Sequence, residues 1–290
     1  MRSVLVAALF VSAAGAAIQA QPVTTPVELH VEIFGSGPPL IALHGFGGNI
    51  YTWHAIRNEL SAGHTVYAFD LKGFGQSPKP RDGKYSVYDQ SRLILDYIAR
   101  HSLKDVTLVG HSFGGGVALA TAVELEERQP GVLSKLVLLD AASYKQSVPW
   151  YIAALRVPII GSLSQHVVTS RKQVKIALED AYYDDTRITK KQIDAYVAPL
   201  LQPGGKYALR ETAKQIVPKD IDAFSGRYAH INVPTLIIWG RHDRVVPLAN
   251  GERLSRDIAN STLVILERTG HTPHEETPDA VRKPLADFLR

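Results

Sequence analysis

Cysteine is absent from the 290-residue chain, and methionine occurs once, at the first position. A chain without thiols forms no disulfide, thiolate zinc site, iron–sulfur cluster or cysteine nucleophile. The excess of one sign of charge over the other is also small, since Lys and Arg number 32 against 28 Asp and Glu, a formal net charge of +4. No run of basic residues concentrates that surplus. The sequence therefore does not predict nucleic acid as a partner, and we expect no membrane surface contact.

An uncharged apolar stretch stands at the N-terminus. It runs over residues 4–18, follows Arg2, and is followed by no charged residue before Glu28. This stretch is shorter than the roughly 20 residues that span a bilayer. Small residues for a signal peptidase stand at the end of this stretch and just after it, at Ala14, Ala16, Ala17 and Ala20. Residues 1–20 are thus predicted to be a signal peptide that directs export to the periplasm or the medium. The alternative is a frayed or membrane-anchored helix.

The remaining chain alternates short apolar runs with longer segments of helical periodicity. With 45% hydrophobic and 21% charged residues, the composition of the full chain is that of a packed soluble protein. One helical stretch, 86–103, begins with Ser86 and has Asp89 three residues on, as in a capping box. The pattern predicts the α/β class, with a mostly parallel sheet flanked by helices. The predicted strands are 27–33, 40–44, 65–69, 106–109, 136–139, 235–239 and 263–266.

One long segment interrupts this alternation. Between Ser143 and about Tyr228 only helical patterns occur, one of them introduced by a capping box of Thr189 and Gln192. A segment of this length is an insertion and not a connecting loop. We therefore predict a core made of residues 21–142 and 229–290, with a helical cap at 143–228.

Residues 110–114 read G-x-S-x-G, with Ser112 at the centre. They follow a predicted strand and precede a helix-compatible run, which is the strand–turn–helix setting of a nucleophile elbow. The alternative is an ordinary turn in which the serine caps the helix.

A serine nucleophile needs a base, and the base needs an orienting acid. Asp243 and His271 each follow a predicted strand, so both side chains are expected at the carboxyl edge of the sheet. The order Ser112, Asp243, His271 is that of the α/β-hydrolase triad. Asp140 follows an earlier strand and is the alternative acid.

The oxyanion of an acyl-transfer reaction needs fixed N–H donors. The glycine-rich residues 44–48 follow the second predicted strand. We expect the backbone N–H groups of Phe46 and Phe113 to be these donors. The alternative is a plain glycine-rich loop. A dinucleotide site is disfavoured, because the glycines lack G-x-G-x-x-G spacing.

Taken together, these motifs resemble those of the α/β-hydrolase superfamily, in its capped serine carboxylesterase-like branch. The resemblance runs over residues 27–290 and rests on five blocks in family order, at 44–48, 70–77, 110–114, 240–243 and 270–274. It implies that Ser112 is the nucleophile, Asp243 the acid and His271 the base. It also implies that the insertion is a lid and that no metal or organic cofactor is used.

Ser112 narrows the set of possible activities within this superfamily. It disfavours the similar dehalogenases and epoxide hydrolases, because these carry aspartate at this position. Ester hydrolysis is the leading interpretation. A C–C hydrolase acting on meta-cleavage products, a perhydrolase or acyltransferase, and a non-catalytic ligand-binding protein remain alternatives.

The apolar cap stretch 148–163 contains one charge. This stretch indicates a lid that covers a pocket for small or medium apolar acyl or aromatic esters. The alternative is that it only docks the cap on the core. Candidate substrate contacts are Trp53, Trp150, Ile152 and Leu155, although Trp53 could instead pack in the core.

Overall fold

A computed structural model describes residues 27–157 and 168–290. The predicted signal peptide, residues 1–20, lies outside the described residues. So does part of the apolar cap stretch.

The core is a seven-stranded sheet in the order β1-β3-β2-β4-β5-β6-β7. Only β1 is antiparallel to its neighbour β3, and every other neighbouring pair is parallel. This confirms the predicted fold class. The strands are β1 (Val31–Gly35), β2 (Pro39–Leu43), β3 (Thr65–Phe69), β4 (Val106–His111), β5 (Leu133–Leu139), β6 (Thr235–Gly240) and β7 (Ser261–Leu266).

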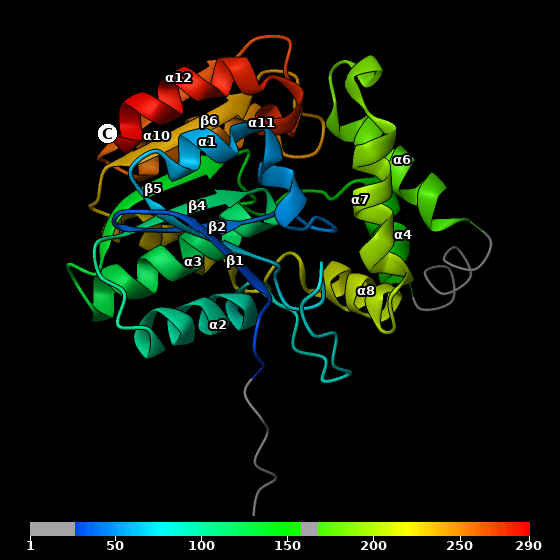
Figure 1. The fold of residues 1–290 in the computed structure, drawn as a ribbon, viewed down its shortest axis with the longest axis horizontal. Coiled ribbons are helices and arrows are strands. Elements are labelled where there is room, and N and C mark those ends of the chain that lie inside the picture. Colours follow the sequence, from blue (N-terminus) through cyan, green and yellow to red (C-terminus); the bar gives the residue numbers. More distant parts are fainter. Residues whose placement is uncertain (1–26, 158–167) are drawn as a thin grey trace, which may run out of the picture.

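Helices cover both faces of the sheet, as Figure 1 shows. Those in the core regions are η1 (Ile50–Ile56), α1 (Arg57–Ser61), α2 (Val87–Arg100), α3 (Phe113–Arg128), α10 (Leu248–Asp257), α11 (Pro273–Glu276) and α12 (Pro278–Leu289). Between β5 and β6 lie α4 (Trp150–Arg156), α6 (Ser170–Ala181), η2 (Asp185–Arg187), α7 (Lys190–Leu201), α8 (Gly205–Gln215), α9 (Ile221–Ser225) and η3 (Gly226–His230). No described helix has the length and apolar character needed to span a membrane.

Alternate residues of each strand face opposite layers of helices, as the two-residue period of a strand requires. On β2, Ile41 and Leu43 pack into the cluster that contains α2, α3 and α10. Leu40 and Ala42 pack with η1, α1 and α12 on the other face. All four side chains are fully buried. Burial on both faces explains why the parallel strands are continuously apolar in sequence.

The first strand begins later than the sequence pattern indicates, at Val31. Its ladder with β3 ends at the pair Val31 and Phe69, because β3 ends there. The preceding residue stays extended but bonds to a loop instead: His30 donates its N–H to Ser77 Oγ at 2.8 Å, and its carbonyl accepts from Asp70 N–H at 3.0 Å.

The fifth strand begins at Leu133, earlier than predicted. The prediction started at Leu136 because two polar residues, Ser134 and Lys135, interrupt the apolar pattern of the strand. The register against β4 shifts between the pairs Val106–Leu133 and Thr107–Lys135, which leaves Ser134 as an extra residue. The Ser134 hydroxyl donates to the Asp105 carbonyl at 3.0 Å. The register shift and this hydrogen bond accommodate the polar Ser134 inside the strand.

The cap segment, residues 143–228, contains only helices among its described residues. In Figure 1, α4, α6, α7 and α8 lie together beside the sheet, beyond its strand ends, and α7 packs against both α6 and α8.

Only half of the predicted capping box of α7 forms. Thr189 Oγ1 accepts from Gln192 N–H at 3.1 Å, but the Gln192 side chain turns away to Tyr182 and Glu275. At α2, by contrast, both bonds of the box between Ser86 and Asp89 are present.

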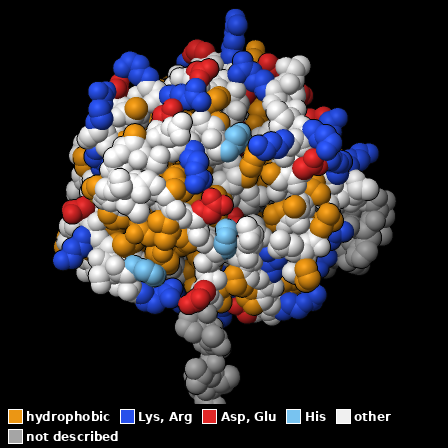
Figure 2. Space-filling model, viewed as in Figure 1, with side chains coloured by type: hydrophobic (Ala, Val, Ile, Leu, Met, Phe, Trp, Pro, Cys, Tyr) orange, Lys and Arg blue, Asp and Glu red, His pale blue; other side chains and the backbone are white. Residues whose placement is uncertain are grey.

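The charge of the surface is dispersed. Figure 2 shows Lys and Arg side chains interspersed with acidic and apolar ones on the face in view.

Candidate active site

Ser112 occupies the sharp turn between β4 and α3 in a strained conformation. Its φ of 52° is in the left-handed region, which residues with a side chain rarely adopt. The flanking glycines permit this turn. A Cβ on Gly110 would lie 2.5 Å from the Gly114 carbonyl oxygen, and one on Gly114 would lie 2.2 Å from the Leu43 carbonyl oxygen. Ser112 N–H donates to the Leu139 carbonyl at 3.0 Å, which ties the turn to the end of β5.

The structure brings His271 and Asp243 to this serine. His271 Nε2 lies 2.7 Å from Ser112 Oγ, and His271 Nδ1 lies 2.8 Å from Asp243 Oδ2. The other carboxylate oxygen, Oδ1, accepts the N–H groups of Val245 and Val246 at 2.7 and 2.9 Å. Asp243 can therefore offer only an acceptor to the imidazole, so Nδ1 carries the proton. That tautomer leaves Nε2 as the acceptor for the Ser112 proton.

The backbone of His271 is fixed from two sides. Its N–H donates to the Ala181 carbonyl, at the end of cap helix α6, at 2.6 Å. Its carbonyl accepts from His111 Nε2 at 2.8 Å. Burial, together with the neighbouring His274 and His271, lowers the pKa of His111 well below its usual value, so His111 is a neutral donor. The imidazole beside Ser112 is thus held by the cap segment as well as by the core.

Asp140, the alternative acid, lies behind Asp243. It is fully buried, and one of its oxygens accepts from Gly240 N–H at 2.9 Å. Burial and the charge of Asp243 raise the pKa of Asp140 well above its usual value, which favours the protonated form of this carboxyl. One atom each of Asp140, Asp243 and His271 lie within 4.8 Å of one another, a spacing that could hold a metal ion. However, the imidazole and Asp243 already bond to each other, and Asp140 Oδ1 accepts from Gly240 N–H, so we interpret these side chains as held by hydrogen bonds within the protein.

The glycine-rich loop 44–48 is fixed by His44. Its Nδ1–H donates to the Gly45 carbonyl at 2.7 Å, and its Nε2 accepts from Leu71 N–H at 3.0 Å. Burial lowers the pKa of His44, which keeps the ring in the neutral form that these two bonds require. Phe46 follows in this loop. Phe113 is the first residue of α3, where an amide N–H has no helical carbonyl to bond.

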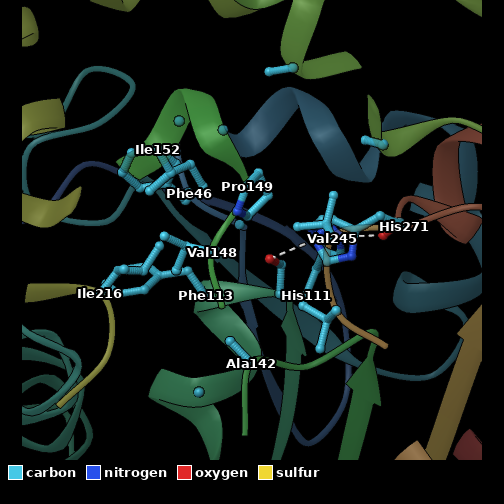
Figure 3. Close-up of a pocket in the computed structure, with 18 of the residues that line it drawn as sticks. Phe46, His111, Phe113, Ala142, Val148, Pro149, Ile152, Ile216, Val245 and His271 are labelled. Atoms are coloured by element: carbon cyan, nitrogen blue, oxygen red, sulfur yellow. Dashed lines mark hydrogen bonds between the residues drawn. The ribbon is translucent and has the colours of Figure 1, made fainter. Parts of the chain in front are cut away.

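A cavity of about 270 Å³ lies above Ser112 between the core and the cap segment. Ser112, His271, Phe46 and Phe113 all line it. Figure 3 shows core residues such as Phe113 and cap residues such as Val148, Ile152 and Ile216 on one side, with His271 across from them. Among its described lining residues none is Lys or Arg, and Glu275 is the single acid. The cavity suits an apolar ligand that carries no negative charge.

The predicted substrate contacts divide into two groups. Trp150, Ile152 and Leu155 line the cavity, although 69% of the Trp150 side chain is exposed. Trp53 is elsewhere, a correction of its expected place. It is 1% exposed and packs with the cluster on the η1, α1 and α12 face of the sheet, and its ring lies against that of His274 in a tilted arrangement with centroids 5.0 Å apart. The neighbouring Thr52 faces the cavity in its place.

Sequence reasoning missed Glu275, which lines the cavity and bonds to both core and cap residues. A signal was available. Glu275 stands only four residues after His271, on the short helix that begins at Pro273. The pattern alone, however, gave no reason to prefer it over His274 or Glu276.

Comparison with known proteins agrees with this geometry. Residues 40–283 match the Alpha/beta hydrolase family, so the chain belongs to that family and is a hydrolase. The chain is 30% identical over 252 residues to the hydrolase YugF of Bacillus subtilis (strain 168), covering 87% of this chain and 89% of the relative.

Two further similar proteins have more specific names. One is the 2-hydroxy-6-oxononadienedioate/2-hydroxy-6-oxononatrienedioate hydrolase of Cupriavidus pinatubonensis, which is 27% identical over 91% of each chain. The other is a solved structure of a meta-cleavage product hydrolase from Pseudomonas fluorescens IP01. It is 25% identical with a TM-score of 0.75, over 91% of this chain and 94% of that one.

Proposed function

We propose that the protein is a serine hydrolase that cleaves carboxylic esters of small or medium apolar acyl or aromatic groups. The observation that carries this proposal is the hydrogen-bonded series Ser112, His271 and Asp243 at the floor of an apolar cavity. A serine beside a base that is itself oriented by an acid is the arrangement required for covalent acyl transfer.

In the proposed mechanism, Ser112 Oγ attacks the ester carbonyl while His271 Nε2 takes the hydroxyl proton. The backbone N–H groups of Phe46 and Phe113 stabilise the negative charge that develops on the carbonyl oxygen. His271 then gives the proton to the departing alcohol, which leaves an acyl group on Ser112. A water molecule, deprotonated by the same imidazole, releases the acid. Asp243 stabilises the imidazolium in both steps.

The charge of the cavity favours esters over the substrates of the similar C–C hydrolases. The name of the Cupriavidus relative describes a dioate, which is a dicarboxylate. Such a substrate would bury negative charge in a cavity whose described lining residues include Glu275 and no cation. Burying a charge without a partner is strongly unfavourable. The similarity to two C–C hydrolases nevertheless makes C–C cleavage the second candidate.

Labelling and turnover test the proposal together. The wild-type chain should react with a fluorophosphonate probe and hydrolyse p-nitrophenyl esters, whereas a Ser112→Ala variant should do neither. A labelled chain that cleaves no ester but opens a meta-cleavage product would establish the C–C alternative. A chain that resists labelling and binds esters without cleaving them would be a non-catalytic ligand-binding protein.

For localisation, we propose that residues 1–20 direct export. The support is the sequence pattern alone. N-terminal sequencing of the protein recovered from a secreting host should give a chain that begins after one of the small residues Ala14, Ala16, Ala17 and Ala20. An intact Met1 on the mature protein would contradict export by cleavage.

A further inference from the structure

Glu275 is a carboxylate of the cavity wall, on α11, four residues after His271. Three side chains donate hydrogen bonds to it. Thr52 Oγ1 and Tyr196 Oη donate to Oε1 at 2.8 and 2.6 Å, and Gln192 Nε2 donates to Oε2 at 2.7 Å. None of these donors is charged. The carboxylate is therefore held in a fixed orientation without any neutralising partner.

His274, on the same short helix, does not supply a positive charge either. Burial and the neighbouring His271 and His54 lower the pKa of His274 to about 3, so its ring is neutral. Its Nε2 lies 2.8 Å from Thr52 Oγ1. Because Thr52 uses its single proton toward Glu275, this contact is a donation from the ring to the hydroxyl.

The other ionisable groups around Glu275 leave its charge uncompensated. The hydroxyls of Tyr51, Tyr182 and Tyr196 have raised pKa values, each through burial first, and are neutral. Glu276 binds backbone N–H groups, those of Gly270 and Asp184. Lys191 on α7 lies over the Tyr51 ring at 5.9 Å, but it is exposed and does not line the cavity.

Burial without a cation has a measurable consequence for Glu275. It raises the pKa of the carboxyl to about 7, although the three hydrogen bonds oppose this shift. The group therefore changes charge near neutral pH. A carboxylate that is held in place inside a ligand cavity, with no Lys or Arg among its described hydrogen-bond partners, is a site where the ligand can provide the counter-charge.

We propose that Glu275 is a specificity-determining residue that selects substrates carrying a positively charged group, such as an alkylammonium, on an otherwise apolar ester. This inference rests on the proposed esterase function, since it names the class of ester. Tyr196 also lines the cavity beside Glu275 and adds an aromatic ring, which attracts cations.

The alternative role for Glu275 is purely structural. Its bonds to Gln192 and Tyr196 of α7 and to Thr52 of η1 tie the cap segment to the core. A tie of this kind would affect the binding of charged and neutral ligands equally. A counter-charge would affect only the cation.

The size of the effect follows from linkage. An opposite charge within about 4–6 Å lowers a carboxyl pKa by 1–3 units, so a cation should bind the ionised form about tenfold more tightly, or better, than the protonated form. A quaternary ammonium keeps its charge at every pH. Its preference should therefore grow as the pH rises through 7, where Glu275 ionises.

The experiment compares two ligands of the same shape on a Ser112→Ala chain, which cannot turn them over. Butyrylcholine is the cation, and 3,3-dimethylbutyl butyrate, in which carbon replaces nitrogen, is the neutral ligand. Calorimetry at about pH 8 should show the cation bound about tenfold more tightly or better, with a smaller ratio at about pH 5.5. The same titration on a Glu275→Gln chain supplies the reference, because that chain keeps every pH-dependent effect other than that of Glu275.

In Ser112→Ala/Glu275→Gln, the affinity ratio at about pH 8 should fall close to one. Glutamine can still accept from Thr52 and Tyr196 and can donate to Gln192 once that amide flips. Glu252→Gln removes the same charge from the exposed surface of α10 and should leave the ratio unchanged.

Equal affinities for the two ligands at about pH 8, or a preference that survives in Glu275→Gln, would overturn the proposal. An equal loss for both ligands in that variant would identify the structural tie. Because binding is measured without turnover, failure here is distinct from failure of the esterase function, which would appear as absent labelling of Ser112.

Discussion

Replacing Asp243 by Asn should almost abolish ester hydrolysis, and the hydrogen bonds of this residue explain why. The N–H groups of Val245 and Val246 both point at Oδ1, so the amide oxygen of an asparagine must remain there. The amide NH₂ then faces His271 Nδ1, which has to become an acceptor. The ring proton moves to Nε2, and the imidazole can no longer accept the Ser112 proton.

The serine-protease precedent for this loss of the correct tautomer is about 10⁴ in kcat, or about 5.5 kcal/mol. We expect Asp243→Asn to approach that loss for a p-nitrophenyl ester under saturating conditions. Asp140→Asn is the matched control, since asparagine can still accept from Gly240 N–H and burial already raises the pKa of this carboxyl. It should cost less than about tenfold.

Both variants should be shown to fold by thermal melting before their kcat values are compared. A larger loss in Asp140→Asn than in Asp243→Asn would refute the assignment of the acid, provided that both variants fold.

Three further predictions follow from the cavity and the turn. Replacing Ile152 and Leu155 by Asp should reduce kcat/KM for medium-chain esters more than for acetate esters, because each lost apolar contact is worth about 1–3 kcal/mol of discrimination. A uniform loss would instead indicate a misfolded cap. The raised pKa of Glu275, about 7, means that the folded state binds this proton more tightly than the unfolded state. Its contribution to stability should be full below the unfolded value near 4.5 and lost as the pH rises to about 7, so urea unfolding should show a falling component that Glu275→Gln lacks. Gly114→Ala would place a methyl group 2.2 Å from the Leu43 carbonyl oxygen, and it should lower both the melting temperature and fluorophosphonate labelling. Unchanged values of both would show that the turn can relax.

The strands of the core were predictable because their signal is local. A strand buried on both faces is apolar along its length, and β6, which is buried throughout, begins where predicted, at Thr235, and ends one residue later than predicted. The edge strand β1 was misplaced because its start depends on where β3 ends, which is a property of pairing and not of its own sequence. The polar Ser134 obscured the start of β5 for a similar reason.

Side-chain direction in short helical segments was harder to predict. Thr52 and Trp53 are neighbours on η1, yet one faces the cavity and the other the opposite layer of the core. Gln192 shows the same limit, since its spacing from Thr189 suits a capping box but its side chain finds stronger partners in Tyr182 and Glu275. Such choices depend on residues that are distant in sequence.

The central claim is that Ser112 forms a covalent acyl-enzyme, and rapid-quench mass spectrometry of the intact protein tests it most directly. After mixing with p-nitrophenyl butyrate, the wild-type chain should gain the mass of one butyryl group, about 70 Da, in step with a burst of p-nitrophenol. Peptide mapping should place that group on Ser112, and the Ser112→Ala chain should show neither adduct nor burst. Sustained ester hydrolysis by Ser112→Ala, or a butyryl group found only on another residue, would contradict the account.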